Sequence, residues 1–70
     1  MTEIRSPITG SVFKIIASVG DAVAVDDLVA LIESMKLEIS VQSEVTGTIR
    51  SVHVAEGDAI AEGDTMFDVA

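Results

Sequence analysis

The 70-residue sequence predicts a single all-β domain made of two small antiparallel sheets that pack face to face. Three observations support this fold class: an internal repeat, short β-branched segments between glycine and aspartate turns, and a lack of helical periodicity. No window of about 10–12 residues free of turn signals places apolar residues on one face of a helix. Apolar residues form 49% of the chain and aromatic residues only 3%, so the core must consist of Val, Ile, Leu and Ala.

The internal repeat relates two halves of the chain at an offset of 37 residues. Ile8–Glu33 aligns without a gap on Val45–Ala70, which gives 26 pairs, of which seven are identical. The repeat predicts a closed, pseudo-symmetric structure, because open repeat arrays need three or more units. The identical pairs are Thr9/Thr46, Gly10/Gly47, Gly20/Gly57, Asp21/Asp58, Ala22/Ala59, Ala24/Ala61 and Asp27/Asp64.

Turn residues divide each half into short strands. Gly20-Asp21 and Asp26-Asp27 punctuate the first half, and Gly57-Asp58 and Gly63-Asp64 punctuate the second. The segments between them are short and rich in β-branched residues. The expected strands are residues 11–16, 28–33, 37–42, 48–54 and 65–69. The expected core pairs are Val12/Ile49, Ile15/Val52, Val23/Ile60, Val29/Met66 and Ile32/Val69.

Residues 34–44 link the two halves and have no counterpart in the alignment. Two strand-like runs flank Met35-Lys36, which therefore occupies the place of a two-residue hairpin turn. This dipeptide lacks the Asn-Gly or Asp-Gly chemistry that such turns prefer. One interpretation is a solvated lysine above a tucked-in Met35. The other interpretation is a functional site, because these two residues do not favour the tight turn that the flanking strands require of them.

Charge and composition exclude several function classes. Four basic and twelve acidic residues give a net charge of −8, which disfavours nucleic acids and anionic membrane surfaces. The chain has no cysteine and therefore no disulfide or thiolate site. His53 is the single histidine, without a second ligand beside it, and the acidic pairs lack the spacing of a calcium loop, so we expect no metal site. Lys14 lies in a strand pattern and is expected at the surface. We expect no catalytic residue. With neither a signal peptide nor a long apolar run at its start, the sequence predicts a cytoplasmic protein.

The hexapeptide Glu-Ser-Met-Lys-Leu-Glu at residues 33–38 resembles the attachment motif of biotinyl domains, commonly Glu-Ala-Met-Lys-Met. The resemblance to the biotinyl/lipoyl attachment family covers residues 1–70, which we treat as one biotinyl domain. It implies a flattened barrel of two four-stranded sheets, with the modified lysine on an exposed hairpin. With no insertion between Gly10 and Glu33, the chain resembles the short, free-standing biotin carboxyl carriers without the "thumb" segment, and the carrier domains of larger carboxylases.

The turn favours biotin over lipoate as the cofactor. Lipoyl domains usually place aspartate before the lysine and alanine after it, whereas Met35 and Leu37 flank Lys36 here. Two alternatives stay open: a lipoyl carrier of a 2-oxo-acid dehydrogenase-type complex, and an unmodified assembly module. An enzyme is the least favoured class, because a chain of this size offers neither catalytic residues nor a pocket.

The resemblance also implies the partners and the role of each residue in the motif. Biotin protein ligase would attach biotin to Lys36, and a biotin carboxylase and a carboxyltransferase would then use it in turn. Met35 and Leu37 flank the attachment point. Glu33, Ser34 and Glu38 are candidates for recognition by the ligase, although solvated charges explain the two glutamates equally well.

Overall fold

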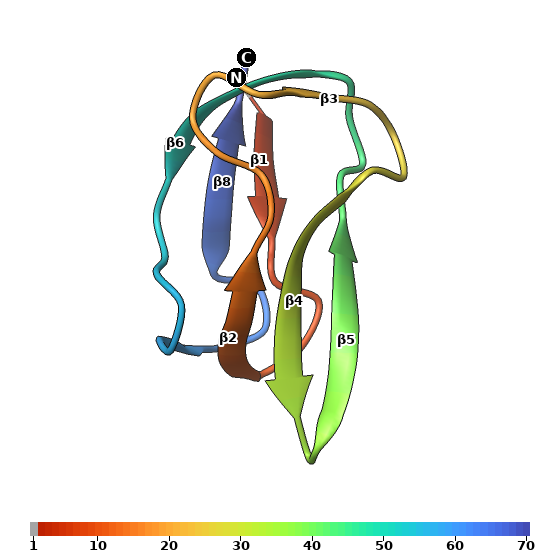
Figure 1. Cartoon of the computed structure of the whole chain (residues 1–70). Helices are drawn as coiled ribbons and strands as arrows, with labels where there is room; N and C mark the ends of the chain where they lie inside the picture. The colour runs from red at the N-terminus through yellow and green to blue at the C-terminus, as the bar shows by residue number, and fades with distance from the viewer. Residues whose placement is uncertain (1) are drawn as a thin grey trace.

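The computed structural model describes residues 2–70, which form two four-stranded antiparallel sheets (Figure 1). The predicted all-β fold class is confirmed. No helix in this part of the chain is long and apolar enough to cross a membrane. The strands are β1 (Thr2–Arg5), β2 (Gly10–Ile15), β3 (Ala22–Val23), β4 (Leu28–Ser34), β5 (Leu37–Gln42), β6 (Gly47–Val52), β7 (Ala59–Ile60) and β8 (Thr65–Val69).

The five expected strands are present, with ends within two residues of the predicted ones. Strands β1, β3 and β7 were not predicted. Strand β1 has four residues, and β3 and β7 have two each, which is too short for an alternating pattern to stand out.

The two halves interleave instead of forming one sheet each. One sheet has the order β1-β8-β6-β3, and the other has the order β5-β4-β2-β7. Each sheet therefore takes two strands from the first half of the chain and two from the second. The short strands β3 and β7 make the exchange, because each pairs with a strand of the opposite half.

The repeat extends further than the sequence alignment indicates. Strand β1 pairs with β8 in the same register as β5 pairs with β4: Thr2↔Val69 and Ile39↔Ile32 are equivalent pairs, 37 residues apart. The prediction that residues 34–44 have no counterpart is therefore wrong for residues 39–43, which correspond to residues 2–6. Residues 39–42 of β5 are the counterpart of β1, and the sequence does not indicate this because none of the four aligned pairs is identical.

The core lies between the two sheets. Four of the five predicted core pairs are buried, while Ile15 and Val52 are partly buried against its edge. Phe67 is fully buried, and its counterpart in the first half is Ala30, which is fully buried too. At this pair of equivalent positions the core is therefore filled by a large side chain in one half and a small one in the other.

Four aspartate turns fix the loops, which confirms that these residues belong to turns. In each turn the aspartate carboxylate accepts a hydrogen bond from the backbone N–H three residues earlier, at 2.8–2.9 Å. The same aspartate N–H donates to the carbonyl oxygen of that earlier residue. The four aspartates are Asp21, Asp27, Asp58 and Asp64.

Candidate functional site

The site is the tip of the hairpin that joins β4 to β5. Ser34 pairs with Leu37, so Met35 and Lys36 form a two-residue turn, as predicted. Both residues have positive φ, 52° at Met35 and 65° at Lys36, which is the conformation of a type I′ turn. This turn matches the twist of the strands, but it places two residues other than glycine in the left-handed region, at a cost of about 1–2 kcal/mol each.

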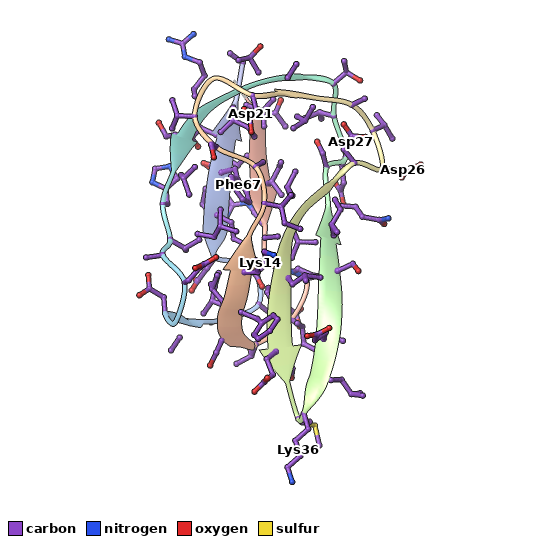
Figure 2. The ribbon with its side chains drawn as sticks, in the orientation of Figure 1. Lys14, Asp21, Asp26, Asp27, Lys36 and Phe67 are labelled. Carbon is purple, nitrogen blue, oxygen red and sulfur yellow. The ribbon has the colours of Figure 1, made fainter. Side chains whose placement is uncertain are left out.

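The turn projects both side chains into solvent. Met35 is 92% exposed, so the interpretation that it tucks under the turn is wrong. Lys36 is exposed as well and extends from the tip away from the body of the domain (Figure 2). An apolar thioether beside an amine, both free of intramolecular packing, is accessible to a modifying enzyme from several directions.

The flanking candidates of the motif form a ladder behind the tip. Glu33 lies directly opposite Glu38, and Ser34 lies opposite Leu37. Both glutamates and Leu37 are exposed, whereas Ser34 is half-buried. Like charges directly opposite each other destabilise a pair of strands. The two carboxylates therefore place negative charge just behind the tip of the hairpin, and a cationic partner would relieve their repulsion.

Gly10, which the sequence did not assign to the site, lies against β4 just behind the hairpin tip. A Cβ atom at Gly10 would collide with the carbonyl oxygen of Glu33. Gly47 has the same relation to the carbonyl oxygen of Ala70. The identity of Gly10 and Gly47 in the repeat was the available signal, and the reason for it is the close approach of two backbones.

The hairpin tip lies at the end of the domain opposite to the start of β1 and the end of β8 (Figure 1). The pseudo-symmetry explains this placement. Strands β4 and β5 are equivalent to β8 and β1, so the turn that joins β4 to β5 is equivalent to the place where the end of β8 lies beside the start of β1. The chain within residues 2–70 measures 31 Å along its longest axis. A modification at the tip is thus presented far from the points where the chain enters and leaves the fold.

The other singled-out residues lie away from the tip. Lys14 is exposed on β2, and His53 is exposed with its Nε2 atom 2.7 Å from Asp68 Oδ2. The described residues contain no group of three or more His, Asp or Glu side chains placed to hold a metal ion. Asp21, Asp26 and Asp27 lie toward the opposite end of the domain from Lys36 (Figure 2).

A family profile described as "Biotin-requiring enzyme", for biotinyl and lipoyl domains, matches residues 2–69 of the chain. The chain belongs to this family. The predicted membership in the biotinyl/lipoyl attachment family is thereby confirmed. Because the matched segment contains both halves and the complete hairpin, the family assignment and the fold describe the same unit.

Curated relatives include both short proteins and large carboxylases. The chain is 40% identical to the biotinylated protein TB7.3 homolog of Mycobacterium leprae, over 89% of this chain and 87% of that protein. It is 39% identical to the human mitochondrial propionyl-CoA carboxylase alpha chain, over 94% of this chain and only 9% of that protein. It is 29% identical to the biotin carboxyl carrier protein of Streptococcus mutans, over 93% of this chain and 50% of that protein. The chain thus spans half or less of two of these relatives.

Solved structures agree with the fold. Urea carboxylase of Kluyveromyces lactis superposes with a TM-score of 0.91 at 32% identity, covering 99% of this chain and 6% of that one. The lipoyl domain of the 2-oxoglutarate dehydrogenase complex of Azotobacter vinelandii gives 0.80 at 26% identity, covering 100% of this chain and 96% of that domain. Biotinyl and lipoyl proteins share this architecture, so the fold alone does not select the cofactor.

Proposed function

We propose that the protein is a biotin carboxyl carrier that holds biotin as an amide on Lys36. The observation that carries the proposal is the type I′ turn, which projects Met35 and Lys36 together from the end of the β4–β5 hairpin. The residues fit the group: the lysine is exposed, and no side chain of the described residues covers the methionine beside it. Biotin supplies a ring nitrogen that accepts and releases a carboxyl group.

Biotin is favoured over lipoate by two independent lines of support. The curated relatives include a biotinylated protein, a biotin carboxyl carrier protein and a carboxylase subunit. Apolar residues, Met35 and Leu37, flank the lysine, as in the biotin motif, and both are largely exposed. The match to a lipoyl domain supports the shared fold and does not select the cofactor, so the lipoyl alternative is the weaker one.

The contribution of this chain is presentation and tethering. An exposed lysine amine is protonated at neutral pH, so an external enzyme must supply both a base and an activated carboxyl group. Nζ of Lys36 would then form the amide, with loss of a proton and of the activating group. The resulting arm spans about 12–15 Å from the lysine Cα atom, by ordinary bond lengths. The turn holds the attachment point at the end of the domain, and tethering raises the local concentration of the carried group.

Residues 2–70 form a carrier domain, and its partners belong to the same proposal. Biotin protein ligase would attach the cofactor, a biotin carboxylase would load it and a carboxyltransferase would unload it. The ligase would recognise the surface around the lysine, which consists of the exposed Met35 and Leu37, the half-buried Ser34, and the paired Glu33 and Glu38. Bond chemistry on the carried group would take place in the partners. A cytoplasmic location stays a prediction of the sequence.

Intact-mass measurement tests the proposal. Co-expression with biotin protein ligase and biotin should add the mass of one biotinyl group, and Lys36→Arg should abolish the gain. Arginine is a suitable replacement because it keeps the charge but cannot form this amide. Lys14→Arg is the matched control, since Lys14 is also exposed, and it should gain the full mass. A lipoyl-sized gain with lipoate ligase alone would establish the lipoyl alternative, and no gain with either ligase would leave the assembly module.

A further inference from the structure

The two methionines within residues 2–70 have opposite surroundings. Met35 is 92% exposed at the hairpin tip, whereas Met66 is fully buried in the core. The chain has no cysteine, so no thiol competes with these two sulfur atoms for an oxidant. Within residues 2–70 the accessible sulfur chemistry therefore lies beside Lys36, and Met66 is an internal reference for the effect of burial on the same side chain.

The turn keeps a change at Met35 local to the tip. Met35 and Lys36 are consecutive residues of positive φ, and the residues on either side of them pair across the hairpin. An exposed side chain has no packing to lose, so a polar group added to Met35 leaves the core and the sheets intact. The same addition at Met66 would place a polar oxygen in the core. A change at Met35 thus alters only the surface around the attachment point.

A hydroperoxide is the class of oxidant that suits this site. The thioether sulfur attacks the terminal oxygen of the peroxide, so that an S–O bond forms and the O–O bond breaks. The sulfur loses two electrons, and the departing oxygen takes up a proton and leaves as water or an alcohol. An exposed lysine amine is protonated at neutral pH, so Lys36 does not compete for the oxidant. The net charge of −8 repels anionic oxidants and does not repel a neutral hydroperoxide.

We propose that Met35 is an oxidation site, and that its sulfoxide form slows the attachment of biotin to the neighbouring Lys36. The effect on attachment rests on the proposed function, in which the ligase recognises the apolar residues around the lysine. Oxidation converts a flexible apolar side chain into a polar, chiral one. A ligase surface that receives an apolar side chain would then have to desolvate the sulfoxide oxygen. The exposed Met35 is also accessible to a methionine sulfoxide reductase, which would make the change reversible.

Peroxide treatment followed by ligation tests the site. The unbiotinylated chain is treated with hydrogen peroxide, catalase removes the peroxide, and ligase, ATP and biotin are added afterwards, so that free biotin is not oxidised. Mass mapping of peptides should find one added oxygen on Met35 and none on Met66, which burial protects. The oxidised chain should gain biotin roughly ten-fold more slowly, because of the desolvation of the sulfoxide. Methionine sulfoxide reductase should restore the original rate.

Met35→Leu is the matched control variant. Leucine keeps an apolar side chain at the tip but has no sulfur, so the ligation rate of this variant should be the same before and after peroxide treatment. The variant retains Met1 and Met66, so it separates an effect of Met35 from oxidation elsewhere in the chain. Thermal melts of the treated and untreated unaltered chain should coincide, because oxidation of an exposed side chain removes no packing.

Three results would overturn the proposal: no added oxygen on Met35, ligation of the oxidised chain at the untreated rate, or a loss of ligation in Met35→Leu as large as in the unaltered chain. Failure of the untreated chain to gain biotin would instead count against the proposed function. That failure would remove the effect on attachment as well, while the mass map would decide separately whether Met35 is the oxidised residue.

Discussion

The hydroxyl groups of Ser6 and Ser43 make the same hydrogen bonds in the two halves of the chain. Ser6 Oγ donates to the carbonyl oxygen of Ile8 at 2.6 Å, and Ser43 Oγ donates to that of Val45 at 2.6 Å. Each hydroxyl also accepts from the N–H of the same residue, at 3.4 and 3.3 Å. Both serines are buried, although they lie in connecting segments. The pseudo-symmetry therefore includes the corners that follow β1 and β5.

Removing either hydroxyl should destabilise the fold by similar amounts. Ser6→Ala and Ser43→Ala should each lower the free energy of unfolding by about 1–2 kcal/mol, because a carbonyl group loses its donor inside a corner. Chemical denaturation measures the effect. Ser40→Ala, on the exposed side of β5, is the control and should change stability by less than about 0.5 kcal/mol. Unchanged stability in both corner variants would show that these hydrogen bonds contribute nothing net.

Gly10→Ala should disturb the hairpin just behind its tip, whereas Gly47→Ala should disturb only the opposite end of the domain. Each added Cβ atom meets a backbone carbonyl oxygen, of Glu33 and of Ala70 respectively. We expect each variant to lose about 1–3 kcal/mol of stability, because the backbones must move apart. Biotin ligation should be slowed in Gly10→Ala and unaffected in Gly47→Ala, when both are assayed well below their melting temperatures. Equal ligation rates would separate Gly10 from the site.

Exchanging Asp26 and Gly63 should shift stability in opposite directions. The two residues are equivalent in the repeat, and both have positive φ, 75° at Asp26 and 89° at Gly63. Asp26→Gly should raise the free energy of unfolding by about 0.5 kcal/mol, because aspartate tolerates this conformation better than most residues but less well than glycine. Gly63→Asp should lower it by a similar amount. Thermal melts of the two variants beside the unaltered chain measure both changes, and a shift in the same direction would contradict the argument.

The positive φ of Met35 should lower the stability of the fold, and its exposed side chain should contribute no packing that offsets this. Met35→Gly should raise the free energy of unfolding by about 0.5–1 kcal/mol, because glycine adopts the positive φ of the turn without strain. Met35→Ala keeps the strain and removes the side chain, so its stability should stay near that of the unaltered chain. Both variants should slow biotin ligation alike if the ligase reads the thioether. Full ligation in either one would remove Met35 from the recognition surface.

Periodicity and repetition were sufficient for the larger strands and for the hairpin. Leu37, Ile39 and Val41 alternate with polar residues, and strand β5 follows that alternation from Leu37 to Gln42. The tip at Met35-Lys36 followed from the strand-like runs on either side of it. Its backbone geometry did not, since nothing local to methionine and lysine favours two consecutive residues of positive φ.

The sequence by itself determined the all-β class, the two-fold repeat, four of the five core pairs and the lysine at the tip, because these depend on spacing along the chain. Tertiary structure decided that β3 joins the sheet of β6 and that β7 joins the sheet of β2. Two-residue strands carry no pattern of their own, so their partners are chosen by packing between the halves. The same packing decided that Ile16 and Leu28 stay exposed beside a core of similar residues. Hydrophobicity indicates that a residue can be buried, and only the assembled sheets determine whether there is something to cover it.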